Sequence, residues 1–261
     1  MGSAEHQGDL WGRESRDWAQ LQEVHSRPLW EAMLDAAGVS TGTVVLDAGC
    51  GSGGAAVLAA GRGATVHGLD AAEGMIEVAR ERVPQGDFRV GDLEGLPFAD
   101  RTFDAVIAAS SVQYAASPVA ALRELARVAR SGSRVAVGLF GAPEKVEYRV
   151  VLSAIRDCLP SPPPGGGPFA LSDPGVLERL VAEAGMTTIE VGEVDGPFEF
   201  IDADTFLMGT MSAGPVQAAV EQVGADALRD AVLTAAEPFR RPDGSIRFAN
   251  KWLYVVAEPS I

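Results

Sequence analysis

A glycine-rich segment, VLDAGCGSGG at positions 45–54, has the residue types of a ligand-binding loop. An apolar run precedes Gly49, Gly51 and Gly54, and a helical pattern follows them. Because glycine lets the backbone approach a ligand closely, we expect the loop to turn its amide groups toward that ligand. The same spacing fits the G-x-G-x-x-G pattern of dinucleotide sites, since Asp70 lies about 20 residues downstream, where such sites hold a ribose. The loop by itself therefore leaves an NAD site open.

A carboxylate at the end of the first predicted strand separates dinucleotides from cationic cofactors. Asp47 precedes Gly49 by two residues, so it would lie close to any pyrophosphate bound by the loop, and like charges would repel there. S-adenosylmethionine instead presents an ammonium and a sulfonium group, and the same carboxylate favours its binding. The sequence therefore predicts a cationic cofactor.

Further candidate ligand residues follow the next three predicted strands. Asp70 ends the second strand, Asp92 follows the third, and a turn follows the fourth. Ligands of a doubly wound sheet bind at the carboxyl ends of the strands, so we expect these residues at one edge. There Asp70 would bridge ribose hydroxyls, and Asp92 would accept a hydrogen bond from an adenine amino group.

Four segments within residues 43–140 resemble a known family. They are VLDAGCGSGG, VHGLDAAEGMIEVAR, GDLEGLPFADRTFDAVIAASSVQY and LRELARVARSGSRVAV. In them the chain closely resembles the class I S-adenosylmethionine-dependent methyltransferases, in particular the ubiquinone/menaquinone-biosynthesis-like, natural-product branch that acts on small molecules. The resemblance implies an α/β fold: a doubly wound, Rossmann-like, seven-stranded sheet with its last strand antiparallel, a helical N-terminal lid and cap insertions. It also implies S-adenosylmethionine as cofactor and S-adenosylhomocysteine as product.

The resemblance assigns roles to individual residues. Asp47 and Gly49 would serve the methionine end of the cofactor, Asp70 would serve the ribose, and Met75 would pack on the adenosine. The expected cofactor-binding residues are Trp18, Asp47, Gly49, Cys50, Gly51, Asp70, Ala71, Met75, Asp92, Leu93, Ala109, Ser110 and Gln113.

By the same resemblance, Asp92 and Leu93 would serve the adenine and the Ala109–Ser110 region the amino group. The resemblance implies the cofactor but not the acceptor. Residues 141–245 and the N-terminal helices contain no recognisable substrate pattern.

Alternating strand and helix patterns would position these residues. Helical patterns separate the apolar runs, as in a parallel sheet covered on both faces. Ser117-Pro118 and Asp173-Pro174 each predict a helix start, with an N-cap and a first-turn proline, whereas Pro84 and Gly185 predict helix ends. The strands are predicted near 43–48, 64–69, 86–91, 103–109 and 133–140.

The rest of the chain is predicted to surround that sheet within a single methyltransferase domain, residues 1–261. Segments 186–194 and 246–257 read as the last two strands, and Asp202 to Arg241 reads as a mostly helical cap, whereas Ser161 to Pro168 reads as a loop. The predicted parts are a helical N-terminal lid (1–40), a cofactor-binding core (41–140), substrate-side insertions with the sixth strand (141–245) and the last strand (246–257).

Two side chains are candidates for catalysis. Tyr114 follows the fourth strand and could act as acid or base, although a buried hydrogen-bonding tyrosine fits equally well. His25 lies on the helical segment that in this family often closes over the cofactor, and a solvated helix residue is the alternative. Trp18 on the same segment is the expected lid contact, with anchoring to the core as its alternative. The sequence shows no cluster of metal ligands.

Composition excludes several kinds of partner. A formal charge of −15 disfavours nucleic acid and anionic membrane surfaces, and no apolar run approaches the roughly 20 residues that span a bilayer. The N-terminus lacks the features of a secretory signal, and Cys50 and Cys158 cannot form a disulfide framework. We therefore expect a cytoplasmic protein with a small-molecule substrate, and the sequence leaves its oligomeric state open.

The expected reaction is transfer of the methyl group of S-adenosylmethionine to an O, N or C atom of a small hydrophobic or aromatic metabolite, without a metal. Positioning and desolvation would lower the barrier. An apolar cluster would form the acceptor pocket, although core packing explains it equally well: Phe198, Phe200, Phe206, Met208 and Met211. The alternatives are a cyclase or isomerase that uses the cofactor without methyl transfer, a non-catalytic cofactor-binding module, and an NAD enzyme.

Overall fold

A seven-stranded sheet runs through the protein in the order β3-β2-β1-β4-β5-β9-β6. The computed structural model describes residues 3–161 and 167–260, and within them β9 pairs antiparallel with β5 and β6 while the other neighbours pair parallel. This confirms the predicted doubly wound α/β class with an antiparallel last strand. The strands are β1 (Val44–Ala48), β2 (Thr65–Asp70), β3 (Asp87–Val90), β4 (Phe103–Ala109), β5 (Ala129–Phe140), β6 (Met186–Asp195) and β9 (Lys251–Pro259).

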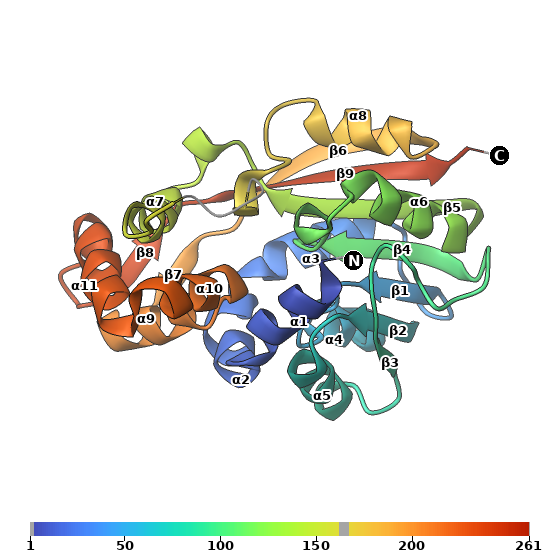
Figure 1. Cartoon of the computed structure of the whole chain (residues 1–261). Helices are drawn as coiled ribbons and strands as arrows, with labels where there is room; N and C mark the ends of the chain where they lie inside the picture. Colours follow the sequence, from blue (N-terminus) through green and yellow to red (C-terminus); the bar gives the residue numbers. More distant parts are fainter. Residues whose placement is uncertain (1–2, 162–166, 261) are drawn as a thin grey trace.

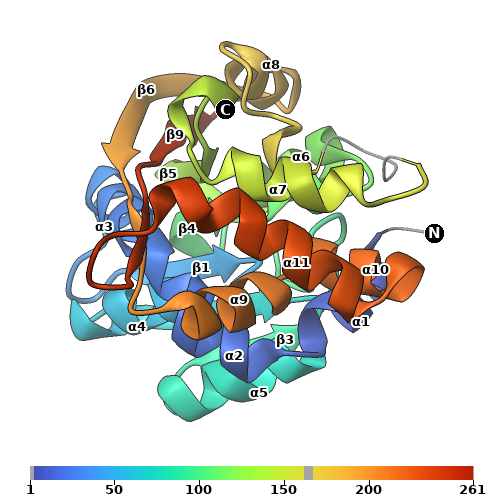
Figure 2. The ribbon, with the colours of Figure 1, turned by 90° about the vertical axis from the view of Figure 1, so that its left-hand side faces the viewer.

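Helices cover both faces of this sheet (Figures 1 and 2). Successive strand residues face opposite layers, so Val45 joins one buried cluster with Leu29 and Leu46 joins the other with Leu122. Strands buried on both faces read as continuous apolar runs, which is why the sequence located them. One face carries α3 (Arg27–Ala36), α4 (Gly54–Gly61) and α5 (Glu73–Arg82), and the other carries α6 (Pro118–Val128) and α8 (Val176–Glu183).

The helix boundaries follow local signals with one exception. Ser117 Oγ accepts a hydrogen bond from the Ala120 amide at 3.3 Å, and Gly185 has a φ of +83°, so both predicted caps are confirmed. The predicted start at Asp173-Pro174 is wrong. Gly175 adopts a φ of +79° and turns the chain, so α8 begins only at Val176, whose amide donates to the Asp173 carbonyl.

The N-terminal segment is helical, as predicted, and lies against the loop that follows β2. Close contact depends on Gly8, because a Cβ there would lie 2.3 Å from the Ala71 carbonyl oxygen. Helix α1 thereby reaches the carboxyl end of β2. The segment, called the lid below (residues 3–26), comprises α1 (Ala4–Gly12), α2 (Ser15–Asp17), a π-helical turn (Trp18–Gln22) and a 3₁₀ turn (Glu23–Ser26).

A mostly helical group, called the cap below, lies beyond the edge of the sheet where the parallel strands end (left in Figure 1). Its helical part confirms the prediction for Asp202 to Arg241, whereas its two-stranded sheet was not predicted. The cap comprises α7 (Arg149–Asp157), β7 (Phe198–Phe200), α9 (Ala203–Met211), α10 (Gly214–Val223), α11 (Ala225–Ala236) and β8 (Ile246–Phe248).

The predicted strand at 246–257 is divided into β8 and β9. At the break, the Ala249 carbonyl accepts from the Glu147 amide at 3.0 Å and Asn250 Oδ1 accepts from the Tyr148 amide at 3.0 Å. These bonds to the start of α7 replace strand pairing, so the chain leaves the small sheet before entering the large one. Of the predicted loop at 161–168, residues 162–166 lie outside the described residues, and Gly167–Phe169 form a 3₁₀ turn. Among the helices described, none has the length and apolar character required to cross a bilayer.

Candidate active site

One cavity lies at the carboxyl ends of the parallel strands, between the core, the lid and the cap. Every residue predicted to bind the cofactor contributes to its wall, and so does Tyr114. This is the place where open α/β sheets bind ligands. The structure thus brings the predicted residues together, and their roles toward a ligand stay predictions. They are Trp18, Asp47, Gly49, Cys50, Gly51, Asp70, Ala71, Met75, Asp92, Leu93, Ala109, Ser110 and Gln113.

The glycine loop uses its own amide groups internally. We expected these amides to face a ligand, and that expectation is wrong, because the five amides of residues 49–53 all donate to protein oxygens. A pyrophosphate would need such amides free, so their use inside the protein is a second argument against a dinucleotide. The acceptors are the Leu69 carbonyl for Gly49 and Cys50 (2.7 and 2.9 Å), Asp70 for Gly51 (2.9 Å), Glu23 for Ser52 (3.0 Å) and the Cys50 carbonyl for Gly53 (2.9 Å).

Asp47 is a buried carboxylate in the cavity wall with an unsatisfied oxygen. Only 2% of the residue is exposed, and Oδ2 has no hydrogen-bond partner. Burial, followed by the charges of Glu23 and Asp70, raises the pKa of Asp47 to about 8, against the opposing effect of the Ala56 amide. A buried carboxylate of this kind calls for a cationic partner. The ammonium group of S-adenosylmethionine fits that requirement.

Asp70 is held at the end of β2 by two backbone amides. Its Oδ2 accepts from Gly51 and its Oδ1 from Ala72, both at 2.9 Å. Each carboxylate oxygen can accept a second hydrogen bond, so the pair remains suited to the two hydroxyls of a ribose. Burial raises the pKa of Asp70, and the amides of Ala72 and Gly51 oppose that rise.

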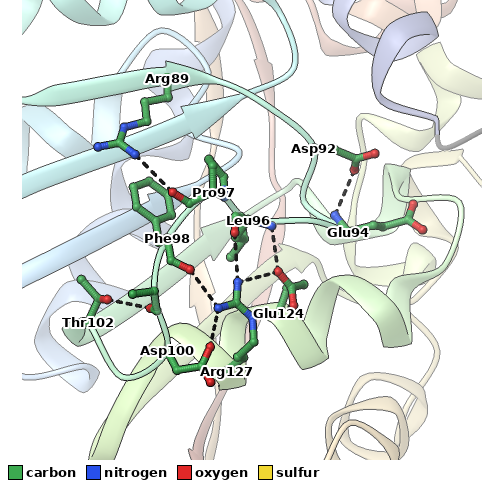
Figure 3. A network of polar contacts seen from close by, with 11 residues as sticks. Arg89, Asp92, Glu94, Leu96, Pro97, Phe98, Asp100, Thr102, Glu124 and Arg127 are labelled. Atoms are coloured by element: carbon green, nitrogen blue, oxygen red, sulfur yellow. Dashed lines mark hydrogen bonds and ion pairs between the residues drawn. The ribbon is translucent and has the colours of Figure 1, made fainter.

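Asp92 begins a loop that two arginines, Arg89 and Arg127, hold in place, and Arg89 donates to the Pro97 carbonyl at 3.2 Å (Figure 3). Asp92 Oδ1 accepts from the Glu94 amide at 2.9 Å, which closes a tight turn at the cavity wall. Further along, Arg127 donates to the carbonyls of Leu96 and Phe98 at 2.9 and 2.8 Å. Helix α6 therefore fixes the loop that carries the predicted adenine-binding residues.

Glu23 lines the site but was not predicted from the sequence. It comes from the lid and lines the cavity, where its carboxylate accepts hydrogen bonds from the Ser52 amide and hydroxyl and from Arg82 at 2.9 Å. Burial raises its pKa, whereas Ser52 and Arg82 lower it. The ion pair ties the lid to the glycine loop and to the last turn of α5. Because 29 residues separate Glu23 from Ser52, no local sequence pattern predicts the contact.

Aromatic rings from the lid meet the turn after β4. Trp11 packs edge-on against both Trp18 and Tyr114, with ring centroids 4.7 and 5.7 Å apart. Burial raises the pKa of the Tyr114 phenol. Tyr114 therefore stays neutral at physiological pH, so of its two predicted roles the acid is favoured over the base.

His25 is not brought to the cavity. Its Nδ1 lies 3.0 Å from the Gln22 carbonyl and its Nε2 lies 2.9 Å from the Glu199 carbonyl, while the ring packs on Phe198 and Phe200. Burial lowers the pKa of His25. The ring ties the lid to the cap, and this placement argues against the catalytic role predicted for it.

The far end of the cavity is aromatic. Phe140 stacks on Trp252 with ring centroids 4.4 Å apart and planes 5° apart, and Phe198 packs at an angle to Tyr148. Below, this group is called the aromatic end: Phe140, Tyr148, Phe198 and Trp252. The opposite group is called the carboxylate end: Glu23, Asp47, Asp70 and Asp92.

The apolar cluster expected to form the acceptor pocket is largely placed elsewhere. Phe198 does line the cavity, whereas Phe206 is fully buried in the core and Met208 is half exposed on the surface of α9. Phe206 packs on Phe200 and Phe248 of the cap's small sheet, and so it is turned away from the cavity. The aromatic end is built from β5, β7, β9 and Tyr148, the residue that precedes α7.

Comparison with known proteins finds a family match for the part of the chain that carries Asp47, Asp70 and Asp92. Residues 46–137 match a family described as a methyltransferase domain. The chain contains a methyltransferase domain. This domain holds β1 to β4 and most of β5, with Asp47, Asp70 and Asp92, and the resemblance seen in the sequence is confirmed.

Two curated relatives are each similar to a little under half of this chain. The malonyl-(acyl-carrier protein) O-methyltransferase of Erwinia pyrifoliae is 38% identical over 124 residues, which make up 48% of this chain and 47% of the relative. The demethylmenaquinone methyltransferase of Renibacterium salmoninarum is 37% identical over 119 residues, which make up 46% of this chain and 50% of the relative. The chain thus matches about half the length of these relatives.

A solved structure extends the similarity to the fold around the methyltransferase domain. The crystal structure of the (4+2)-cyclase SpnF covers 89% of this chain and is itself covered to 81%, with a TM-score of 0.58 and 18% sequence identity. Similarity at this identity shows the shared fold alone, and fold does not decide the reaction.

Proposed function

We propose that this protein transfers the methyl group of S-adenosylmethionine to an O, N or C atom of a small, uncharged hydrophobic or aromatic metabolite. The observation that carries the proposal is the unpaired, buried oxygen of Asp47 at one end of a cavity whose other end is aromatic. The methyltransferase domain and the two relatives support the cofactor.

In this proposal, three residues of the carboxylate end each bind a different group of the cofactor. Asp47 would hold the ammonium, Asp70 the ribose hydroxyls and Asp92 the adenine amino group. The bound cofactor supplies an electrophilic methyl group. The chain's own contribution is to orient the acceptor in line with that group and to exclude water, for which the lid tryptophans Trp11 and Trp18 are placed.

Charge favours an uncharged acceptor. Among the described residues that line the cavity, the charged side chains are Glu23, Asp47, Asp70 and Asp92, all of them acidic. An acceptor with a carboxylate, such as the malonyl group in the name of one relative, would find no described cation there. An acceptor of the kind named in the other relative, demethylmenaquinone, is uncharged and fits these walls better.

We also propose that the protein works on small metabolites in the cytoplasm without a metal. Its charge of −15 opposes nucleic acid, and its two cysteines are unpaired thiols, as in a reducing compartment. Addition of a chelator should leave the transfer rate unchanged.

The test is a methyl-transfer assay with isotopically labelled S-adenosylmethionine and a panel of uncharged aromatic acceptors, alongside calorimetry of cofactor binding. We expect labelled product, S-adenosylhomocysteine in equal amount, and tighter binding of S-adenosylmethionine than of NAD. Cofactor binding without label transfer to any acceptor would contradict the proposal. A product formed with the cofactor unchanged would instead establish a cyclase or isomerase.

A further inference from the structure

Two polar side chains stand out at the boundary between the lid and the aromatic end. Gln22 is 5% exposed and lines the cavity, and its Oε1 has no hydrogen-bond partner. Tyr148 is 4% exposed, lines the same cavity and donates its hydroxyl to Thr210 Oγ1 at 3.0 Å. An unpaired amide oxygen in a buried wall is costly unless a ligand satisfies it.

The two side chains form one cluster. Burial raises the pKa of the Tyr148 phenol, whereas its hydrogen bonds with the side chains of Thr210 and Gln22 lower it. Tyr148 therefore stays neutral, and because its proton is directed to Thr210, its oxygen is left to accept. Gln22 ends a π-helical turn, a conformation that is rare and often found at functional sites.

The walls around this cluster restrict the shape of a ligand. Phe140 and Trp252 lie nearly parallel, and Phe198 closes the side of the stack at 5.9 Å from both ring centroids. The position of the Trp252 ring requires a glycine at residue 196, since a Cβ on Gly196 would lie 2.1 Å from the indole Nε1. Rigid aromatic walls of this kind favour a flat, apolar ring system.

We infer that Gln22 and Tyr148 recognise a hydroxyl group on an uncharged, planar aromatic acceptor whose rings lie against Phe140, Phe198 and Trp252. The acceptor's O–H donates to the unpaired Gln22 Oε1 or to the Tyr148 oxygen, which turns the ring carrying that hydroxyl toward the cofactor side of the cavity. This inference rests on the proposed function and specifies its substrate class: aromatic alcohols, in preference to aromatic carboxylates and to rings without a donor. Neither residue removes a proton; both position the acceptor.

Calorimetry with three naphthalenes tests the inference on the full chain, with and without saturating S-adenosylhomocysteine. The ligand 2-naphthol carries the donor, 2-fluoronaphthalene replaces it with an atom of similar size that cannot donate, and 2-naphthoate adds a negative charge. We expect 2-naphthol to bind about tenfold tighter than 2-fluoronaphthalene, the difference that one buried hydrogen bond makes, and 2-naphthoate to bind more weakly still.

Two variants and one control separate recognition from folding. In Tyr148→Phe and Gln22→Met, the preference for 2-naphthol over 2-fluoronaphthalene should fall to about threefold or less. Tyr254→Phe is the matched control, because the Tyr254 hydroxyl donates to the exposed Glu190 on β6, outside the cavity, and it should keep the full preference. A merely structural role of Tyr148 would weaken both ligands equally and leave their ratio unchanged.

Several outcomes would overturn the inference. These are equal binding of 2-naphthol and 2-fluoronaphthalene to the unaltered protein, equal or tighter binding of 2-naphthoate, absence of binding by all three, or an unchanged ratio in both variants. Each of them leaves methyl transfer to other acceptors possible. The proposed function fails by a separate result, namely binding of the cofactor without transfer to any acceptor.

Discussion

The two ends of the cavity offer a ligand different physical features. The carboxylate end uses charge: Asp47 and Asp70 lie within the short stretch that carries the glycine loop, and their burial raises both pKa values. The aromatic end uses shape, with rings delivered by separate segments that include Phe140, Phe198 and Trp252. If the proposed function holds, the comparison teaches that recognition of the methyl donor is encoded locally, whereas recognition of the acceptor depends on the completed fold.

The two ends also differ in their effect on the stability of the protein without a bound ligand. Burying carboxylates without a counter-ion is unfavourable, and of the carboxylate end only Glu23 has an arginine partner, Arg82, among the described residues. Stacked rings gain free energy from burial whether or not a ligand is present. We therefore expect removal of an unpaired carboxylate to raise stability and lower cofactor affinity, whereas a change to the stacked rings should lower acceptor affinity and leave cofactor affinity unchanged.

The largest expected effect separates the two ends. Asp47→Asn removes the buried charge, so the affinity for S-adenosylmethionine should fall about 100-fold, as for truncation of one member of a buried charge pair. Binding of 2-naphthol should stay within about twofold, because the aromatic end is untouched. Calorimetry measures both. Asp230→Asn, at an exposed position on α11, is the control and should change neither affinity.

The pH dependence of cofactor binding follows from the same carboxyl group. Asp47 has a pKa of about 8 in the empty site, so below that pH a cationic cofactor must displace a proton to bind. The affinity for S-adenosylmethionine should rise about tenfold per pH unit from pH 6 to pH 8 and then level off. In Asp47→Asn the profile should be flat over this interval. An equally steep profile in the variant would assign the proton to another group.

Stability should respond to Asp47 in the opposite direction. A carboxyl group whose pKa is higher in the folded than in the unfolded chain favours folding at low pH, and this contribution is lost as pH rises from about 3.9 through about 8. The empty Asp47→Asn protein should therefore melt at a higher temperature than the unaltered protein at pH 8, and the difference should shrink toward pH 5. Thermal unfolding without ligand checks this. A lower melting temperature at pH 8 would contradict it.

Glu23→Gln should weaken the carboxylate end more moderately. The amide can keep one hydrogen bond to Ser52 but loses the charge that pairs with Arg82, so we expect about tenfold weaker cofactor binding and a loss of about 2 kcal/mol in the free energy of unfolding. Denaturant unfolding and calorimetry measure these. Glu81→Gln removes an exposed ion pair to Arg16 and should change stability by less than about 0.5 kcal/mol. Equal losses of stability and cofactor affinity in Glu23→Gln and Glu81→Gln would contradict the role of Glu23 in linking the lid to the glycine loop.

The smallest effect is expected at the aromatic end. Gly196→Ala places a methyl group against the Trp252 indole and should shift that ring, lowering the affinity for 2-naphthol about fivefold through overpacking. Cofactor affinity should not change. Gly61→Ala, where a Cβ would meet no atom within 4 Å, is the matched control. Loss of cofactor binding in Gly196→Ala would show that the two ends are not independent.

Local sequence determined the core of the fold and the cofactor side of the cavity. The buried strands were recognisable as apolar runs, and Ser117 and Gly185 marked the start and the end of helices. Asp47, Asp70 and Asp92 were recognisable because each lies at or just after the end of a predicted strand. Each of these signals lies within a few residues of the structure that it specifies. Such signals survive in a single sequence because backbone propensity and periodicity act over one turn or one strand.

Tertiary structure decided everything that required distant segments to meet. The glycine-loop amides donate inside the protein because oxygens of Leu69, Asp70 and Glu23 lie within hydrogen-bond distance of them. His25 lies against the Glu199 carbonyl, which is 174 residues away in the sequence. At the aromatic end, Phe140 of β5 and Trp252 of β9 likewise meet because the two strands pair antiparallel. No local pattern encodes such contacts, because they arise from the strand order of the sheet and from the position of the cap over its edge.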